Sequence, residues 1–136
     1  KGNLLKYYIP AQISGCLFGV MLANVFFEHA LLELSTKNRD GLHIFFSEIV
    51  ATFGLIFIIF ATLKDGKTIV AISVATYISA GYWFTSSTSF ANPAVSIART
   101  FTDSFTGINY LNTPTYILAE FIGLILAAYI LKIIYK

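Results

Sequence analysis

The residue pattern with the clearest chemical potential is Asn92 followed directly by Pro93 and Ala94. Asn is a strong helix N-cap and Pro is favoured at the first helical position, so this pair predicts a helix that begins at residue 93. The Asn92 side-chain oxygen can accept a hydrogen bond from that helix, while its amide hydrogens can act as donors. The start of the helix would therefore present donors and a partial positive charge to a passing molecule.

This helix lies within residues 86–114, a segment whose composition is unusual for a connection. Small, hydroxylated and apolar residues fill the segment, and its charged residues are Arg99 and Asp103. Long structureless connections are uncommon in compact proteins and are usually functional. A short apolar helix with a buried start fits a re-entrant half-helix, which is tolerated at membrane depth only where it lines a cavity.

The composition places these residues in a membrane. Of the 136 residues, 57% are hydrophobic and 12% are charged, and the mean hydropathy is +0.75. So apolar a chain excludes a disordered protein, and a net charge of +2 is too small for a nucleic-acid-binding surface. The single Cys16 excludes a disulfide framework and a cysteine-cluster metal site. The remaining class is an integral membrane protein, with the lipid bilayer as its partner.

Four apolar stretches are long enough to cross a bilayer, for which about 20 residues are needed. Helices satisfy their own backbone hydrogen bonds within lipid, and the stretches lack the alternation of barrel strands. We therefore predict an all-α membrane protein with four transmembrane helices and one re-entrant half-helix. The transmembrane helices are expected at residues 7–27, 43–63, 68–85 and 115–135, and the half-helix at 93–102.

Basic residues are unevenly distributed between the two ends of these helices. If the four helices alternate in direction, six lysines share one side of the membrane and three basic residues lie on the other. By the positive-inside rule, this predicts a multi-pass cell-membrane protein with the N- and C-termini of the chain in the cytoplasm. The chain begins without Met, and we interpret it as a partial or processed chain. The six are Lys1, Lys6, Lys64, Lys67, Lys132 and Lys136, and the three are Lys37, Arg39 and Arg99.

Glu48 and Glu120 are acidic residues inside the apolar stretches, and such residues are functional candidates by default. Glu120 is equally compatible with a near-interface position from which its end reaches water. His29 and His43 flank the first loop and lack the further ligands that a metal site would need. No nucleophile, base and orienting residue form a catalytic set. The sequence therefore favours a protein that is not an enzyme and that needs no metal or cofactor.

The tripeptide at residues 92–94, between the third and fourth apolar stretches, resembles the signature of the aquaporin, or major intrinsic protein, family. Residues 47–53 resemble the acidic opening of that family's fourth helix, and the resemblance covers essentially all of residues 1–136 as one channel domain. It implies an aquaporin-like right-handed helical bundle, of which this chain holds helices three to six. The fold is incomplete, because the family's N-terminal half, with a first Asn-Pro-Ala motif, is missing from this sequence.

The resemblance implies a passive channel for water and small uncharged solutes, assembled as a homotetramer in which each subunit holds its own pore. Residues 92–94 would form the pore signature, where the half-helix dipole disfavours cations. Glu48 would brace the preceding loop through its backbone amides rather than relay protons. That loop would run extended and expose its carbonyls to the solute, from Thr88, Ser89, Phe90 and Ala91.

The family's narrowest point would be built here from Ala80, Ser89 and Val95. Val95 stands where most members carry an arginine, and residues 95–99 resemble the bacterial branch associated with arsenic-resistance operons. A constriction without that arginine is wider and less polar, which favours glycerol-like polyols or neutral metalloid hydroxides such as arsenous acid. Arg99, four residues beyond Val95, is either a charge in the outer vestibule or a cap on the carbonyls at the half-helix's end.

Two alternatives to a channel remain open at this point. One is a structural or regulatory membrane subunit that does not conduct. The other is a coupled secondary transporter, which needs an ionisable residue at mid-membrane facing a substrate. Glu48 is the sole candidate for that role, which weakens the transporter interpretation.

Overall fold

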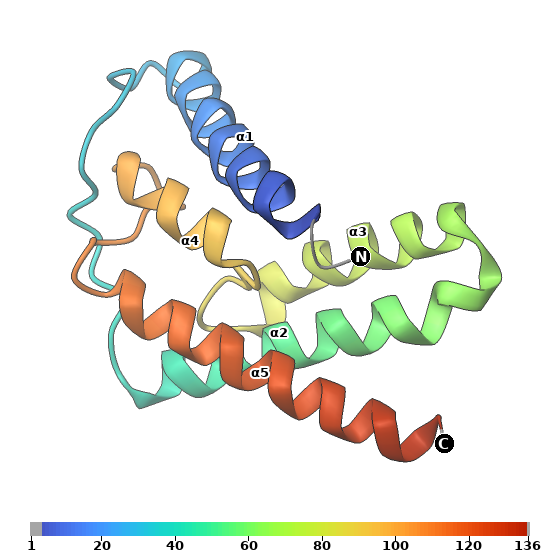
Figure 1. Cartoon of the computed structure of the whole chain (residues 1–136). Coiled ribbons are helices and arrows are strands. Elements are labelled where there is room, and N and C mark those ends of the chain that lie inside the picture. The colour runs from blue at the N-terminus through green and yellow to red at the C-terminus, as the bar shows by residue number, and fades with distance from the viewer. Residues whose placement is uncertain (1–3, 136) are drawn as a thin grey trace. The chain divides into compact units, whose positions relative to one another are not determined.

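The structure is a computed structural model that describes residues 4–135. Lys1 and Lys136, both counted in the orientation argument, lie outside the described residues. The described part of the chain is helical and contains no strand, which confirms the predicted all-α class. Its helices, shown in Figure 1, are α1 (Leu5–Phe26), α2 (Leu42–Thr62), α3 (Lys67–Phe84), α4 (Pro93–Ala98) and α5 (Thr113–Ile134).

Among the described residues, three helical segments are long and apolar enough to cross a membrane: α1, Leu42–Asp65 and α5. The second of these is α2 continued by a 3-10 turn, Leu63–Asp65. Helix α3 coincides with the stretch expected at residues 68–85 but is not among the three. Its crossing of the membrane stays a prediction. The half-helix expected at 93–102 is α4 followed by a 3-10 turn, Arg99–Phe101.

The described residues divide into two compact parts. The half-helix unit consists of the residues up to Arg39 together with Asn92–Pro114. The three-helix unit consists of Asp40–Ala91 and the residues from Thr115 onwards. Most of α5 belongs to the three-helix unit.

In the half-helix unit, α4 packs along α1 (Figure 1). Asn24 joins the end of α1 to the turn after α4, because its amide nitrogen donates to the Phe101 carbonyl at 3.0 Å and to the Leu31 carbonyl at 3.3 Å. The Asn24 side chain is 2% exposed, so these hydrogen bonds satisfy a buried polar group. The half-helix is thereby fixed to α1 through polar as well as apolar contacts.

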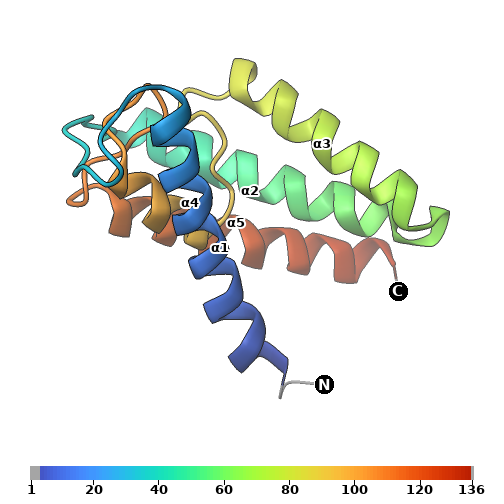
Figure 2. The same ribbon diagram turned by 90° about the horizontal axis from the view of Figure 1, so that it is seen from above.

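In the three-helix unit, α2 and α3 lie side by side and run in opposite directions (Figure 2). The Tyr77 hydroxyl donates to the Ala51 carbonyl of α2 at 3.0 Å and packs over Gly54, where an added Cβ would meet the tyrosine ring. Helix α5 meets α2 at Gly123, where a Cβ would lie 2.6 Å from the Ile49 carbonyl oxygen. Small residues therefore permit the close approach of these helices.

Candidate functional site

The start of α4 has the geometry that its sequence predicts. Asn92 is extended, with a φ of −160°, and its side-chain oxygen accepts a hydrogen bond from the Ala94 N–H at 2.9 Å. Pro93 occupies the first turn, where its missing N–H removes no helical hydrogen bond. The Ser96 N–H donates to the Asn92 carbonyl at 3.0 Å and continues the helix. Asn92 therefore fixes the beginning of the half-helix.

Glu48 holds the end of the loop that leads to Asn92. The side chain is fully buried in α2, and its carboxylate accepts the Ala91 N–H at 2.5 Å and the Phe90 N–H at 3.4 Å. Backbone donors are suitable partners for a buried carboxylate, which is costly to bury without hydrogen bonds. This is the contact that a bracing acid would make. The hydrogen bonds from Phe90 and Ala91 do not support a role for Glu48 in proton relay.

The extended conformation predicted for residues 88–91 is wrong. Thr88, Ser89 and Ala91 have φ angles of 62°, 51° and 50°, in the left-handed region. Turn conformations of this kind can direct neighbouring backbone N–H groups toward one acceptor, and here Glu48 accepts those of Phe90 and Ala91. Ser89, Phe90 and Ala91 are also buried. The role of these carbonyls in contacting a solute stays a prediction.

Tyr116, a residue that the sequence argument did not single out, supports the same loop. It is 1% exposed, its hydroxyl donates to the Ser87 carbonyl at 3.2 Å, and its ring centre lies 4.9 Å from that of Phe90. The sequence did contain one signal for this role, because Tyr116 lies in the first turns of an apolar helix. A tyrosine buried there needs a hydrogen-bond partner for its hydroxyl. Tyr116 and Glu48 thus fix the loop from α5 and α2.

The three residues predicted for the constriction are divided between the two units. Ala80 is exposed on α3, beside Gly81. Ser89 is buried, and a Cβ at Gly81 would lie 2.7 Å from its hydroxyl oxygen. That hydroxyl has no hydrogen-bond partner within the described residues. Val95 belongs to the half-helix unit, and the convergence of the three residues stays a prediction.

Val95 and Arg99 line one cavity of about 250 Å³ between α4 and α1 in the half-helix unit. Most residues of the cavity wall are apolar and small. A Cβ added at Gly19 would meet no atom within 4 Å. Arg99 lies on the wall with Val95, as the vestibule interpretation requires, and its role stays a prediction. Cys16 also lies on this wall. The lining residues are Cys16, Gly19, Val20, Ala23, Val95, Ala98, Arg99 and Thr106.

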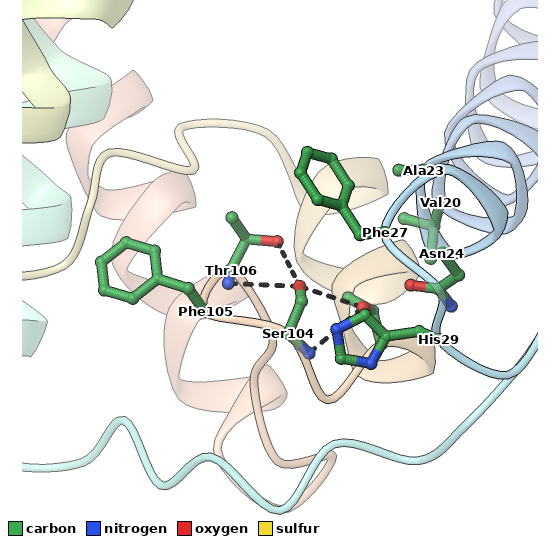
Figure 3. Close-up of a pocket in the computed structure, with 9 residues that line it drawn as sticks. Val20, Ala23, Asn24, Phe27, His29, Ser104, Phe105 and Thr106 are labelled. Carbon is green, nitrogen blue, oxygen red and sulfur yellow. Dashed lines mark hydrogen bonds between the residues drawn. The ribbon is translucent and has the colours of Figure 1, made fainter.

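A neighbouring cavity of about 350 Å³ lies at the C-terminal end of α1 (Figure 3). The two cavities share Val20, Ala23 and Thr106 on their walls. In Figure 3, Ser104 and Thr106 face the cavity from the loop after α4, and their hydroxyls are 3.1 Å apart. His29 is on the cavity wall, and its Nδ1 lies 2.7 Å from the Glu33 carboxylate. The shared residues show that the two cavities adjoin each other along α1.

The loops around these cavities are tied by charged residues. The Arg39 guanidinium donates to the carbonyls of Gly107 at 2.8 Å and Phe105 at 2.7 Å, whereas the sequence argument used Arg39 only for orientation. Asp103 accepts the Thr36 backbone N–H at 2.7 Å, and this hydrogen bond lowers the pKa of the Asp103 carboxyl below its ordinary value. Glu120 is 2% exposed within α5, which contradicts the alternative in which its end reaches water.

A sequence profile of major intrinsic proteins matches residues 4–130. The chain belongs to the major intrinsic protein family. It is also 42% identical over 125 residues to aquaglyceroporin AqpS of Rhizobium meliloti (strain 1021). That alignment covers 92% of this chain and 54% of AqpS, so the chain spans about half the length of this curated relative. No solved structure matched the chain. Family and apolar helices together establish a membrane protein.

Proposed function

We propose that the whole protein carrying this chain is a passive transmembrane channel for water and small uncharged solutes. The observation that carries the proposal is the Asn92-capped half-helix, whose Val95 and Arg99 line a cavity along α1. A solute beside such a helix start meets hydrogen-bond donors, whereas a cation meets the positive end of the helix dipole. Membership in the major intrinsic protein family supports the same mechanism.

The solute class that we propose is glycerol-like polyols or neutral metalloid hydroxides such as arsenous acid. Val95 supports it, because a valine after the Asn-Pro-Ala motif places an apolar side chain where a guanidinium would narrow the path and attract water. Gly19, Ala23 and Ala98 are small residues that line the same cavity. The relative AqpS carries the name aquaglyceroporin, which supports a polyol.

The contacts of Glu48 support a coupled transporter less well than they support a channel. A proton-coupling carboxylate must exchange protons with water or substrate during transport. Glu48 is fully buried and accepts backbone hydrogen bonds from Phe90 and Ala91. A bracing role explains these contacts without any coupling.

The experiment is stopped-flow swelling of vesicles that contain the whole protein, with glycerol or arsenous acid as the permeant solute. We expect flux above that of empty vesicles, proportional to the solute gradient and independent of a proton gradient. Flux that saturates and requires a proton gradient would establish a transporter. Absence of flux from correctly inserted protein would establish a non-conducting subunit.

The proposal includes the remaining features of the family architecture. The whole protein would supply a second half with its own Asn-Pro-Ala motif, assemble as a homotetramer and hold a pore in each subunit. The N- and C-termini of this chain would lie in the cytoplasm. Lys64 and Lys132 support one part of this topology, because they line a single groove and so place the C-terminal ends of α2 and α5 at the same end of the three-helix unit.

A further inference from the structure

Residues 28–39, here called the strap, follow α1 and run beside the segment after α4 (Figures 1 and 2). Both segments belong to the half-helix unit. Ser35 and Thr100 are 3% and 6% exposed, so the contact between the segments is internal to this chain. Backbone N–H groups join them by donating from Glu33 to the Phe101 carbonyl at 3.4 Å, from Ser35 to Thr100 at 2.9 Å, and from Asn109 to Lys37 at 2.8 Å.

The strap holds the C-terminal end of the half-helix. Helix α4 has six residues and is followed by a three-residue 3-10 turn, which is too short a helix to be stable alone. Its position therefore depends on how its two ends are held, and Asn92 holds the first. At the other end, the Thr100 and Phe101 carbonyls accept N–H groups of the strap. A shift of the strap would therefore move the turn after α4 and the helix that carries Val95.

The Asp103 carboxylate fixes the middle of the strap. It accepts the Thr36 backbone N–H at 2.7 Å, the Thr36 hydroxyl at 3.0 Å and the Ser35 hydroxyl at 3.4 Å. The Asp103 N–H donates in turn to the Glu33 carboxylate at 3.3 Å. Hydrogen bonds to an ionised acceptor are stronger than those between neutral groups. Asp103 thus links the strap to the segment after α4 through both its side chain and its backbone.

Arg39 fixes the far end of the strap. Its guanidinium donates to the Gly107 carbonyl at 2.8 Å and to the Phe105 carbonyl at 2.7 Å. A planar fork of donors can hold two acceptors at once, which a lysine ammonium does less rigidly. A Cβ at Gly107 would overlap the Thr102 carbonyl and the Ser35 hydroxyl, so the missing side chain lets the strap lie directly on the loop.

We propose that Asp103 and Arg39 are positioning residues for solute passage, which act through the strap on the half-helix that carries Val95. The inference rests on the proposed function, because it concerns the path beside α4. Neither side chain has to touch the solute. A half-helix held at both ends keeps the path open for a molecule of the size of glycerol, whereas a displaced half-helix narrows the path more for glycerol than for water.

The test compares glycerol and water permeability of vesicles that contain the whole protein, unmodified or with one substitution. Asp103→Ala and Arg39→Gln should each lower the ratio of glycerol to water flux by roughly 2- to 30-fold, the range for substitutions that act on a site through packed contacts. Asp103→Asn keeps an oxygen that can accept the Thr36 N–H and should retain most of the ratio. The matched control Asp65→Ala removes the same charge from an exposed position between α2 and α3 and should leave the ratio unchanged.

Hydrogen exchange measured by mass spectrometry follows the strap without any flux. Exchange of residues 33–37 should be faster in Asp103→Ala by roughly tenfold or more, as expected for the loss of hydrogen bonds to a charged group. The inference is overturned if Asp103→Ala and Arg39→Gln lower both fluxes in the same proportion, or if strap exchange in Asp103→Ala is unchanged. Absence of flux in the unmodified protein would instead contradict the proposed function, so the two failures are distinguishable.

Discussion

At the scale of single residues, the proposed selection of solutes depends on Val95. It lies in α4 and lines the same cavity as Arg99. In the proposed channel, its apolar and compact side chain would leave room for a solute larger than water. The family resemblance places an arginine at this position in most members, which makes the reverse substitution informative.

Val95→Arg should reduce glycerol or arsenous acid flux by about tenfold, equivalent to about 1.4 kcal/mol in the barrier, while water flux falls less. The physical reason is that a guanidinium narrows the path and holds water tightly. Stopped-flow swelling with each solute checks the prediction. Val95→Leu, which changes shape without charge, is the control and should retain polyol selectivity. Equal selectivity in Val95→Arg and the unmodified channel would remove Val95 from the constriction.

Glu48 is the residue on which the loop before the half-helix depends. Glu48→Gln keeps the size of the side chain but removes its charge and turns an amide toward backbone donors. We expect the free energy of unfolding to fall by about 1.5–3 kcal/mol, the range for hydrogen bonds to a charged group. Thermal unfolding in detergent measures the change. Glu28→Gln, an exposed control, should shift it by less than about 0.5 kcal/mol. An unchanged transition in Glu48→Gln would show that the bracing contact contributes nothing.

At the scale of elements, the glycines decide how closely the helices approach. Gly123→Ala should destabilise the protein by about 1–3 kcal/mol, because the new methyl group meets the Ile49 carbonyl of α2 and the backbone must shift. The control is Gly15→Ala in α1, where a Cβ meets nothing within 4 Å. That change should be neutral or stabilising by about 0.5–1 kcal/mol. Equal effects of the two substitutions on thermal unfolding would contradict the packing of α5 on α2.

The connection between Thr36 and Asp103 gives the loop region a dependence on pH. Hydrogen bonds from Thr36 favour the ionised carboxylate, so the pKa of Asp103 in the folded protein lies below the ordinary value of 3.8. Such a group contributes stability above its unfolded pKa and loses it as the pH falls through the lower, folded value. The stability difference between the unmodified protein and Asp103→Asn should therefore be constant near neutral pH and disappear below 3.8. Thermal unfolding of both proteins, measured across this pH range, checks the prediction. A stability difference that grows as the pH falls would contradict it.

At the scale of the whole molecule, local signals predicted more of the structure than long-range ones. The helix start at Asn92 and Pro93 depends on neighbouring residues, and the apolar stretches gave helices whose bounds differ from prediction only at their ends. The left-handed loop was not predicted, because the carboxylate that accepts its backbone N–H groups belongs to Glu48, which is remote in the sequence. Arg39 and Tyr116 were missed for the same reason. The sequence shows that these residues are an arginine and a tyrosine, but it does not show which backbone carbonyls they contact.

The central claim is that solutes pass the half-helix along the cavity that Val95 lines. The most direct test is glycerol permeability of vesicles containing the whole protein as Val95→Cys in a Cys16→Ser background, before and after a methanethiosulfonate reagent. Leu118→Cys, on an exposed part of α5, is the labelled control. The account predicts that labelling at position 95 blocks most of the flux, whereas labelling at 118 leaves it unchanged. Complete labelling at position 95 with undiminished flux would contradict the account.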